Sequence, residues 1–484
     1  MKYYIGIDMG TSSLKLTIVD ESGNITIQLS EEYDYAMPNP DWREINPSVW
    51  IQALNTVMKK LGAIAPAEMK SIICIGITGQ MHTTCFLDMA GKNIRPAIMW
   101  NDTRAVKLLI NLKEKIKKQQ KAAHIADIIS SGSPALNIYW LKKCEPENFA
   151  RLDKFLIGPD YMVYYLTGYK GTDYCEASTS SLYDLYNGNW SEEIRIIIGL
   201  RKEQYPTING SSAIVGLVHK TLADKWHISR DVKVIAGTGD NAAAAVATGV
   251  YEYGFASMSL GTSGVLVFTR DKLDFSLKGK NIAFSVDGKK LDFLVQGVLQ
   301  SCGRTMNWWL KNIVGENDFS NAFNSISLKK SAQKQLLFYP HIMGDKTLYG
   351  DTNLRGAFLG LSENDTKDDM LAAIMEGIAF ATRELIEKMA VPKKRLQSLR
   401  FTGGGSKNKL WLQIMASVLN MPVQAMPDMG GASYGAALLA MEKLPKHSND
   451  AAAEIIYPEK KLSEWYRQKY NKYLKIYEAI ENVF

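Results

Sequence analysis

The sequence lacks any long apolar run, since no stretch approaches the ~18 consecutive apolar residues that a membrane-spanning helix needs. It has only five cysteines in 484 residues, and no two of them form a Cys-x-x-Cys pair. That usage argues against a disulfide framework and a zinc site. The N-terminus enters a strand pattern directly, without the charged and apolar regions of a signal peptide. We therefore expect a soluble, cytoplasmic protein with no membrane partner.

Several functional motifs are also absent. The chain has neither a GxxxxGK[ST] sequence nor a GxGxxG in its first βαβ unit, which excludes a P-loop enzyme and a dinucleotide fold. No HExxH or Cys/His cluster supports a catalytic zinc. The net charge of +7 is mild, and the densest lysine stretch, Lys113 to Lys121, is interrupted by Glu114 and indicates one solvated helix face. We expect no nucleic-acid partner.

The sequence does contain an internal repeat. Residues 3–17 and 255–269 each consist of a β-rich run, a Gly-Thr-Ser tripeptide and a second run of alternating or apolar residues. Each copy predicts a β-hairpin with the tripeptide as its turn. Chance could produce two such tripeptides, but the flanking strands and the half-chain separation favour a duplicated domain. Two domains also suit the length, because one hydrophobic core usually stops growing near ~250–300 residues.

Strand and helix patterns alternate along both halves of the chain. Short apolar strands are predicted at Ile72–Thr78, Val232–Ala236 and Leu399–Thr402. Helices are predicted at Asn241–Val250, Leu371–Met389, 408–420 and 433–442, and an amphipathic helix with an aromatic packing stripe at Leu462, Tyr466, Tyr470, Tyr473 and Tyr477. Such alternation predicts α/β domains with central sheets covered by helices.

The two Gly-Thr-Ser turns are candidate phosphate sites. Such a turn exposes backbone N–H groups that can cradle phosphate oxygens, and its hydroxyls add further donors. Two turns facing each other across a cleft would hold a polyphosphate between them. Asp8 ends an apolar strand two residues before the first turn, a suitable place to hold Mg²⁺ through water. The alternative is that Asp8 caps its neighbours' amides in the turn.

Asp240 follows the compact loop Gly237–Gly239 and opens an alanine-rich helix. It is either an N-cap, where Asp is favoured, or a general base that accepts a proton as an alcohol attacks phosphorus. The residues alone leave both roles open. Gly403 to Ser406 follows a strand, and its glycines let the backbone approach a flat or anionic ligand. His82 follows another strand, and a single histidine is more often structural than functional.

Together these motifs resemble the FGGY family of carbohydrate kinases, and within it the xylulokinases. The resemblance runs over roughly residues 3 to 443. Its segments, in family order, are IGIDMGTS (5–12), GQMH (79–82), WNDTR (100–104), Thr172-Asp173 with Ala177-Ser178, GTGDNAA (237–243), SLGTSG (259–264), DTNLRGAFLGLS (351–362) and FTGGGS (401–406). Each segment alone is weak evidence for the family, but eight segments in the family order over two domains are highly specific for it.

The resemblance implies an α/β fold of two ribonuclease-H-like (actin-like ATPase) domains, residues 1–245 and 246–484, with the active site in the cleft between them. It implies ATP and Mg²⁺ as cofactors, a small sugar as substrate, and a homodimer. Asp240 would be the catalytic base, and Mg²⁺ would lie at Asp8 and Asp240. The sugar-binding residues would be Met81, His82, Trp100, Asp240 and Asn241. The nucleotide-binding residues would be Asp8, Gly10, Thr11, Ser12, Gly261, Thr262, Ser263, Gly404, Gly405 and Asn408.

The GQMH and GDNAA segments favour D-xylulose over glycerol or gluconate as the sugar, with D-xylulose 5-phosphate as product. Three segments depart from the family pattern: Thr83 follows the histidine, Gly344-Asp345-Lys346 replaces Gly-Glu-Arg, and Pro159-Asp160-Tyr161 replaces Lys-Asp-Tyr. A lysine cannot make the bidentate contact of an arginine. Another ketose, polyol or sugar acid therefore stays open as substrate. A remoter alternative is an actin- or chaperone-like ATPase that binds a partner, in which the GTGDNAA and GQMH segments have no evident role.

Overall fold

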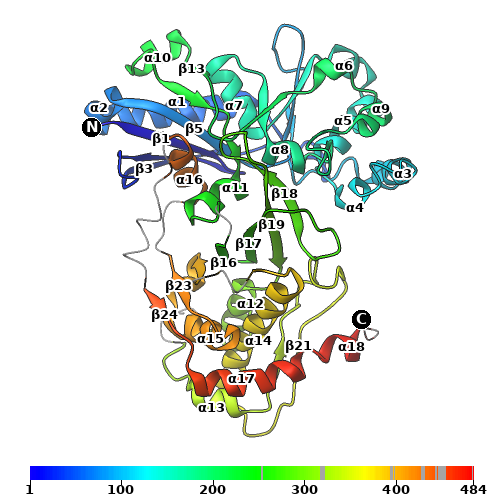
Figure 1. Cartoon of the computed structure of the whole chain (residues 1–484), viewed down its shortest axis with the longest axis vertical. Helices are drawn as coiled ribbons and strands as arrows, with labels where there is room; N and C mark the ends of the chain where they lie inside the picture. The colour runs from blue at the N-terminus through cyan, green and yellow to red at the C-terminus, as the bar shows by residue number, and fades with distance from the viewer. Residues whose placement is uncertain are drawn as a thin grey trace.

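The computed structural model describes residues 1–251, 254–316, 322–392, 396, 398–426, 431–441, 444, 454–481 and 483. Figure 1 shows two halves stacked along the long axis, each built on its own seven-stranded sheet. The N-terminal half lies at the top of that view, and the C-terminal helices lie at the bottom.

The first sheet has the strand order β13-β14-β5-β1-β2-β3, and β15 pairs with β5. Its strands are β1 (Tyr3–Met9), β2 (Ser13–Val19), β3 (Ile25–Glu32), β5 (Ile72–Gly79), β13 (Ile214–Leu217), β14 (Lys233–Ile235) and β15 (Thr238–Gly239). The central strand β5 is parallel to β1, β14 and β15. Parallel strands are covered by helices on both faces, which explains why β5 is almost wholly apolar and buried.

The second sheet repeats this plan in the order β18-β19-β17-β16-β22-β23-β24. Its strands are β16 (Ala256–Leu260), β17 (Gly264–Arg270), β18 (Lys280–Phe284), β19 (Asp292–Leu299), β22 (Leu399–Thr402), β23 (Val423–Ala425) and β24 (Ile455–Ile456). The hairpin β16–β17 corresponds to β1–β2, and β22 is parallel to β16 as β5 is to β1. Both hairpins predicted from the repeated Gly-Thr-Ser segments are thus confirmed.

Smaller sheets and helices surround these two sheets. The other strands are β4 (Glu44–Ile45), β6 (Thr84–Leu87), β7 (Ala97–Ile98), β8 (Lys154–Ile157), β9 (Gly171–Asp173), β10 (Tyr183–Asp184), β11 (Asn189–Trp190), β12 (Thr207–Asn209), β20 (Leu337–Tyr339) and β21 (Ala357–Leu359). The α-helices are α1 (Pro47–Ile64), α2 (Pro66–Lys70), α3 (Val106–Lys117), α4 (Ile125–Ile128), α5 (Pro134–Cys144), α6 (Pro146–Arg151), α7 (Gly158–Thr167), α8 (Tyr174–Thr179), α9 (Glu192–Ile198), α10 (Lys220–Trp226), α11 (Asp240–Ala247), α12 (Gly303–Trp308), α13 (Leu328–Gln333), α14 (Lys367–Lys388), α15 (Lys409–Leu419), α16 (Gly431–Leu439), α17 (Lys460–Tyr473) and α18 (Ile476–Ile480).

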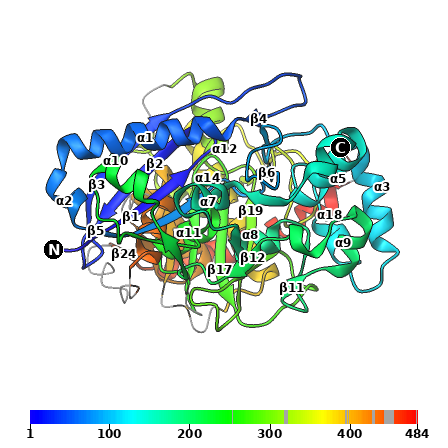
Figure 2. The ribbon, with the colours of Figure 1, turned by 90° about the horizontal axis from the view of Figure 1, so that it is seen from above.

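Helices α11 and α16 lie side by side between the two sheets, and α16 packs on β1, β2 and β5 although it comes late in the chain (Figures 1 and 2). The close approach depends on glycine. A Cβ atom at Gly6 would lie 1.8 Å from the carbonyl oxygen of Ser433, and one at Gly435 would lie 1.8 Å from that of Ala243. One hydrophobic cluster therefore joins α11 and α16 to strands of both sheets. The division into residues 1–245 and 246–484 stays a prediction.

The predicted elements mostly coincide with observed ones. Strand β22 has the predicted bounds, and α11 begins at Asp240, one residue before the predicted start. The aromatic stripe packs in the core as predicted, but the chain breaks it into α17 and α18, with Tyr477 on the second. Residue 442 of the predicted helix 433–442 lies outside the described residues. Among the helices that the structure describes, none is long and apolar enough to cross a membrane.

Candidate active site

Three parallel strands of the first sheet end side by side. Asp8 on β1 is in register with Thr78 on β5, and Thr78 is in register with Thr238 on β15. Each strand ends one residue further on, at Met9, Gly79 and Gly239. The loops that follow therefore leave from one edge of the sheet, the edge at which α/β proteins bind their ligands. This edge brings together Asp8, the first Gly-Thr-Ser turn, Met81, His82 and Asp240.

The first Gly-Thr-Ser turn is held by hydrogen bonds on both sides. The Gly10 amide donates to the Ser13 carbonyl (2.9 Å) and closes the turn. The Gly10 carbonyl accepts hydrogen bonds from the Tyr33 hydroxyl (2.5 Å) and the Gln80 side-chain amide (3.2 Å). The Thr11 hydroxyl accepts from the indole nitrogen of Trp100 (3.1 Å), while Ser12 is exposed.

Asp240 is the first residue of α11, and Gly239 occupies the N-cap position. The N-cap alternative for Asp240 is therefore wrong, and its Oδ1 accepts a hydrogen bond from the amide of Asn241 (2.8 Å). Burial, and then the charge of Asp8, raise the pKa of Asp240 to about 7. A carboxyl with a pKa near neutrality is suited to accept a proton from an alcohol and to release it again.

Asp8 has the same kind of environment. Its Oδ1 is buried and has no hydrogen-bond partner, so this oxygen does not cap the turn. Burial raises the pKa of Asp8 to about 6, against the opposing effect of Lys15. In the described part of the chain, no three His, Cys, Asp or Glu residues form a metal-binding group. Two carboxylates nonetheless suit Mg²⁺, which usually takes one or two of them and completes its shell with water and phosphate oxygens.

Met81 and His82 lie against the loop that ends at Asp240. Met81 is buried, and a Cβ atom at Gly239 would lie 2.6 Å from its Cγ. His82 has a φ of 69°, in the left-handed region that non-glycine residues rarely adopt. Its Nδ1 is buried without a hydrogen-bond partner, and burial and then Lys280 hold the pKa of His82 well below its ordinary 6.5. The imidazole is thus neutral, with a ring nitrogen left for a ligand hydroxyl.

Two charged residues that the sequence patterns did not single out also lie here. Glu176, on α8, is fully buried, and neither of its carboxylate oxygens has a hydrogen-bond partner. A Cβ atom at Gly239 would lie 2.8 Å from its Oε1, so Glu176 packs directly behind the Asp240 loop. Burial lowers the pKa of Lys280, on β18, and the nearby Cys175 and Glu176 oppose this shift only in part. Glu176 lies between the family motifs Thr172-Asp173 and Ala177-Ser178, which was a usable signal, whereas nothing in the sequence marked Lys280.

The second Gly-Thr-Ser turn faces the first half across a cavity of about 840 Å³. The Gly261 and Thr262 carbonyls accept hydrogen bonds from the amides of Gly303 (2.8 Å) and Arg304 (3.1 Å) at the start of α12. The residues that line the cavity include Trp100, Thr262, Ser263, Lys280, Arg304 and Lys346. The second turn thus borders this cavity, and the first turn is connected to it through Trp100, whose indole donates to Thr11. The C-terminal wall of the cavity carries three cationic side chains. None of those three forms an ion pair within the described residues.

A smaller cavity of about 360 Å³ lies between α11 and the second sheet. Asn241, Thr402 and Gly403 are among the residues that line it, and Asn241 also donates a hydrogen bond to the Gln296 side chain (3.4 Å). The other predicted residues of this region are not in its lining. Gly404 is exposed, a Cβ atom at Gly405 would lie 2.6 Å from the Trp411 ring, and Asn408 caps α15 by accepting from the Trp411 amide (3.0 Å).

The three departures from the family pattern lie in different places. Thr83 is buried and donates to the Gln80 side chain (3.0 Å). Asp160 is also buried and accepts from the Ile157 amide (3.1 Å) at the start of α7. Only Lys346 of the three segments lines the large cavity. Of the three departures, Lys346 is therefore the one whose side chain can contact a ligand in the large cavity.

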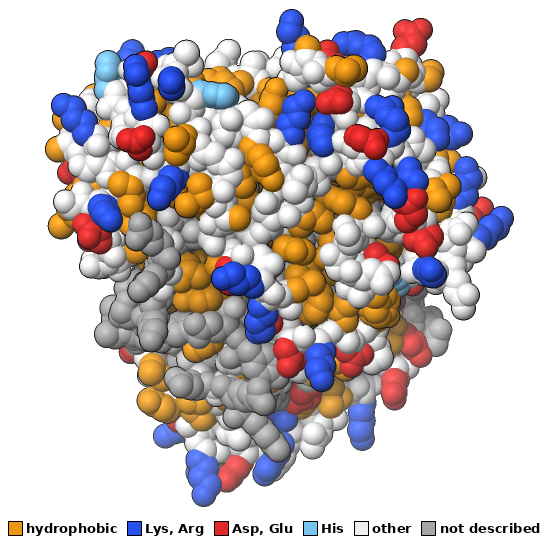
Figure 3. All heavy atoms as spheres, turned by 45° about the horizontal axis from the view of Figure 1, so that its top comes forward, with side chains coloured by type: hydrophobic (Ala, Val, Ile, Leu, Met, Phe, Trp, Pro, Cys, Tyr) orange, Lys and Arg blue, Asp and Glu red, His pale blue; other side chains and the backbone are white. Residues whose placement is uncertain are grey.

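Charges are dispersed over the face of the molecule that Figure 3 shows. On the face shown in Figure 3, Lys and Arg side chains are interspersed with Asp and Glu and do not form one continuous stripe. The expected lack of a nucleic-acid partner stays a prediction.

The chain is similar in sequence and in structure to known proteins of one family. The family model of the FGGY carbohydrate kinases matches twice, its N-terminal domain over residues 3–247 and its C-terminal domain over residues 256–443. The chain belongs to the FGGY family of carbohydrate kinases. The family expected from the motifs is confirmed, and with it an ATP-dependent carbohydrate kinase as the class of enzyme.

Individual relatives are similar over nearly their whole length. The chain is 30% identical to the xylulose kinase of Bacillus subtilis, over 99% of this chain and 97% of that protein. It is 27% identical to the glycerol kinase of Pseudothermotoga lettingae, over 91% and 89% of the two chains. The crystal structure of a xyloylose kinase from Brucella ovis superposes with a TM-score of 0.87 at 30% identity, over 100% of both chains. The expected fold of two ribonuclease-H-like (actin-like ATPase) domains with an intervening cleft is confirmed.

Proposed function

We propose that this FGGY kinase phosphorylates D-xylulose to D-xylulose 5-phosphate with ATP. The observation that supports it most directly is the pair Asp8 and Asp240 at one sheet edge, with the pKa of Asp240 raised to about 7. The likeness to a xylulose kinase over nearly the whole chain supports this choice of sugar.

In the proposed reaction, Asp240 accepts the proton of the sugar hydroxyl as that hydroxyl attacks the γ-phosphorus of ATP. Met81, His82, Trp100 and Asn241 orient the sugar so that one hydroxyl lies within hydrogen-bond reach of Asp240. The bond from the γ-phosphorus to its bridging oxygen breaks, and ADP leaves with that oxygen. Exclusion of water from the cleft prevents hydrolysis of ATP in place of transfer.

The phosphates are proposed to lie between the two repeated turns. Gly10, Thr11 and Ser12 approach them from one half, and Gly261, Thr262 and Ser263 from the other. Mg²⁺, held by Asp8 and Asp240 through water, would neutralise charge on the phosphate oxygens. Arg304 and Lys346 line the C-terminal wall of the large cavity together with Thr262 and Ser263, so they add positive charge beside the proposed phosphate site.

The adenosine part of ATP is proposed to occupy the side of the cleft nearer the second sheet. Thr402 and Gly403 line the smaller cavity there, and Gly404, Gly405 and Asn408 follow directly in the chain. Because Gly404 is exposed and no atom lies within 4 Å of a Cβ placed on it, its backbone is open to a ligand. The homodimer and the cytoplasmic location stay predictions.

The test is ADP release by the purified protein with MgATP, with and without D-xylulose. Strong stimulation by D-xylulose would support both the reaction and the sugar. If D-xylulose gives no stimulation while another sugar does, the choice of D-xylulose is wrong and the kinase assignment stands. If no ketose, polyol or sugar acid stimulates release, and ATP hydrolysis responds instead to a protein or peptide, the partner-binding ATPase becomes the better interpretation.

A second candidate substrate class follows from the cationic wall of the large cavity. Lys346, which stands where the family pattern has arginine and keeps its positive charge, lines this wall with Arg304. A cationic wall also suits a sugar acid, whose carboxylate it would attract. Gluconate belongs in the same assay, and a higher kcat/KM for gluconate than for D-xylulose would favour this candidate.

A further inference from the structure

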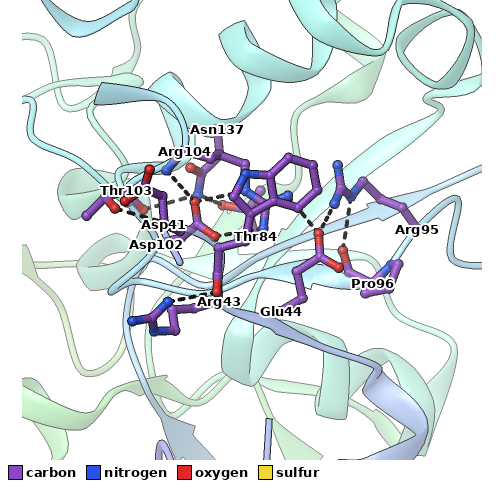
Figure 4. Close-up of polar contacts among 12 residues, drawn as sticks. Asp41, Arg43, Glu44, Thr84, Arg95, Pro96, Asp102, Thr103, Arg104 and Asn137 are labelled. Atoms are coloured by element: carbon purple, nitrogen blue, oxygen red, sulfur yellow. Dashed lines mark hydrogen bonds and ion pairs between the residues drawn. The ribbon is translucent and has the colours of Figure 1, made fainter. Parts of the chain in front are cut away.

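The segment Trp100–Arg104 forms a buried ionic network with residues far along the chain. Asp102 accepts hydrogen bonds from the amide of Arg43 (2.5 Å) and from the Nε and Nη2 atoms of Arg104 (2.9 and 2.7 Å). The Nη1 atom of Arg104 donates to Glu44 (2.7 Å), which also accepts from Arg95. Figure 4 shows the Glu44 carboxylate directed toward the Arg95 guanidinium. These side chains are almost wholly removed from solvent, with 1% of Asp102 and Arg104 exposed.

Aromatic rings complete the network. The Arg104 guanidinium lies 3.9 Å from the centre of the Trp42 ring and 5.0 Å from that of Trp140. The Arg95 guanidinium lies 5.1 Å from the Trp140 ring, and the two tryptophans meet edge to face at 5.6 Å. Planar guanidinium groups held by two carboxylates and stacked on indoles have little freedom to move. The network is therefore a rigid support.

Backbone hydrogen bonds beside the network hold the chain on both sides of Trp100, and the Arg43 amide ties them to the Asp102 carboxylate. Before it, the Met99 amide donates to the Arg43 carbonyl (3.0 Å), and after it the Thr103 amide donates to the Asp41 carbonyl (2.9 Å). Behind it, a Cβ atom at Gly132 would lie 1.9 Å from the Trp100 carbonyl oxygen, so the chain has no room to retreat. Trp100 is nonetheless 46% exposed, and it lines the large cavity.

We propose that Glu44, Asp102 and Arg104 are positioning residues, which hold the Trp100 indole at the mouth of the cleft against Thr11. This inference rests on the proposed function for the role of the cleft. A buried ionic network is weak evidence for stability, because apolar residues often replace such networks without loss. A half-exposed indole, in contrast, has several accessible rotamers, and only a fixed backbone keeps its N–H directed at the Thr11 hydroxyl. The network thus fixes one wall of the sugar site and joins it to the first phosphate-binding turn.

The test is Glu44→Gln, which removes one carboxylate and leaves Arg104 paired with Asp102 and Arg95 with Glu145. We expect KM for the sugar to rise about 10-fold, with a smaller change in kcat, because a misplacement of about 1 Å can cost up to about 10²-fold and the loss of one carboxylate should displace the indole by less. In a Trp100→Ala background, the same substitution should leave KM unchanged, because the group it positions is gone. An equal rise in KM in both backgrounds would overturn the proposal.

Glu376→Gln is the matched control. Glu376 forms an equally buried ion pair with Lys469 in the C-terminal half, far along the chain from Trp100. Both substitutions should lower Tm, but only Glu44→Gln should raise KM for the sugar. A similar rise in KM for Glu376→Gln would mean that loss of stability alone explains the effect, and the proposal would fail.

A second readout does not depend on activity. Protein labelled with 5-fluorotryptophan gives fluorine NMR signals for its ten tryptophans, and the signal lost in Trp100→Phe identifies Trp100. Glu44→Gln should shift or broaden that signal, and Glu376→Gln should leave it in place. An unmoved Trp100 signal in Glu44→Gln would refute the positioning role. Failure of every sugar to stimulate ADP release would refute only the proposed function.

Discussion

Asp8 and Asp240 both lie at the carboxyl edge of the first sheet, and the negative charge of Asp8 contributes to raising the pKa of Asp240 to about 7. The two residues are 232 positions apart in the chain, yet parallel pairing of β1, β5 and β15 places the ends of their strands side by side. Burial disfavours the charged form of both carboxyls, so the free protein holds two groups that a cation would stabilise in their ionised forms.

The first prediction concerns catalysis by Asp240. Asp240→Asn keeps the shape of the side chain and removes the proton acceptor. We expect turnover with the sugar to fall about 10²–10⁴-fold, because that is the usual contribution of a general base. ATP binding, measured by calorimetry, should persist. Near-normal turnover in this variant would show that another group accepts the proton.

The second prediction concerns pH and stability in the absence of metal and nucleotide. The pKa of Asp240 is raised from 3.8 to about 7, so the folded protein binds this proton more tightly than the unfolded chain does. The contribution of Asp240 to the free energy of unfolding is therefore greatest below about pH 4, and this contribution is lost as the pH rises toward 7. Asp240→Asn removes the penalty, so at pH 8 in EDTA it should be more stable than the parent by roughly 1–4 kcal/mol. At pH 4 the variant and the parent protein should differ little in stability. If the curves of Tm against pH ran parallel for the two proteins, they would contradict the burial of this charge.

The third prediction concerns the cationic wall of the cleft. Arg304→Gln and Lys346→Gln should each raise KM for ATP about 10-fold, because each removes one charge that neutralises the phosphates. Lys346→Arg should retain low KM, since the charge is kept. Lys329→Gln, an exposed lysine on α13, is the control and should change nothing. An unchanged KM for ATP with a raised KM for the sugar would place these cations on the sugar side instead.

The fourth prediction concerns the packing of α11 against α16. Gly435→Ala places a Cβ atom 1.8 Å from the carbonyl oxygen of Ala243, so the two helices must separate. Overpacking of this kind typically costs about 1–3 kcal/mol, and backbone cannot move aside as a flexible side chain would. Tm should fall, and turnover should fall with it, because α11 carries Asp240. Gly62→Ala, inside helix α1 with only the flexible Met69 sulfur near, should be neutral or stabilising.

Much of the site was predictable because its parts are local in sequence. A Gly-Thr-Ser tripeptide between two strand patterns predicts a hairpin turn from short-range sterics, and both turns occur as predicted. Asp8 at a strand end and Asp240 at a helix start could be recognised in the same way. The N-cap alternative for Asp240 could not be excluded from sequence, because one residue of difference in the helix start decides it.

Lys280 and Arg304 could not be found from sequence patterns, and the role of Glu176 was signalled only by its place between two family motifs. Glu176 matters because it packs behind Gly239, and Lys280 matters because β18 carries it into the cleft. Neither relation leaves a periodic signal, since the partners lie far apart in the chain and belong to different elements. The hydrogen bond from Trp100 to Thr11, over 89 residues, is hidden for the same reason.

The sequence by itself therefore determined the two repeated hairpins, the alternation of strands and helices, and the chemical groups available for phosphate and sugar. These depend on backbone sterics and on hydrophobic periodicity, which act over a few residues. The tertiary structure alone decided which groups lie close together: Asp8 and Asp240, Trp100 and Thr11, and helix α16 and the first sheet. These arrangements depend on strand register and on close packing at Gly6 and Gly435. Both depend on residues far apart in the sequence, which only the folded chain brings into contact.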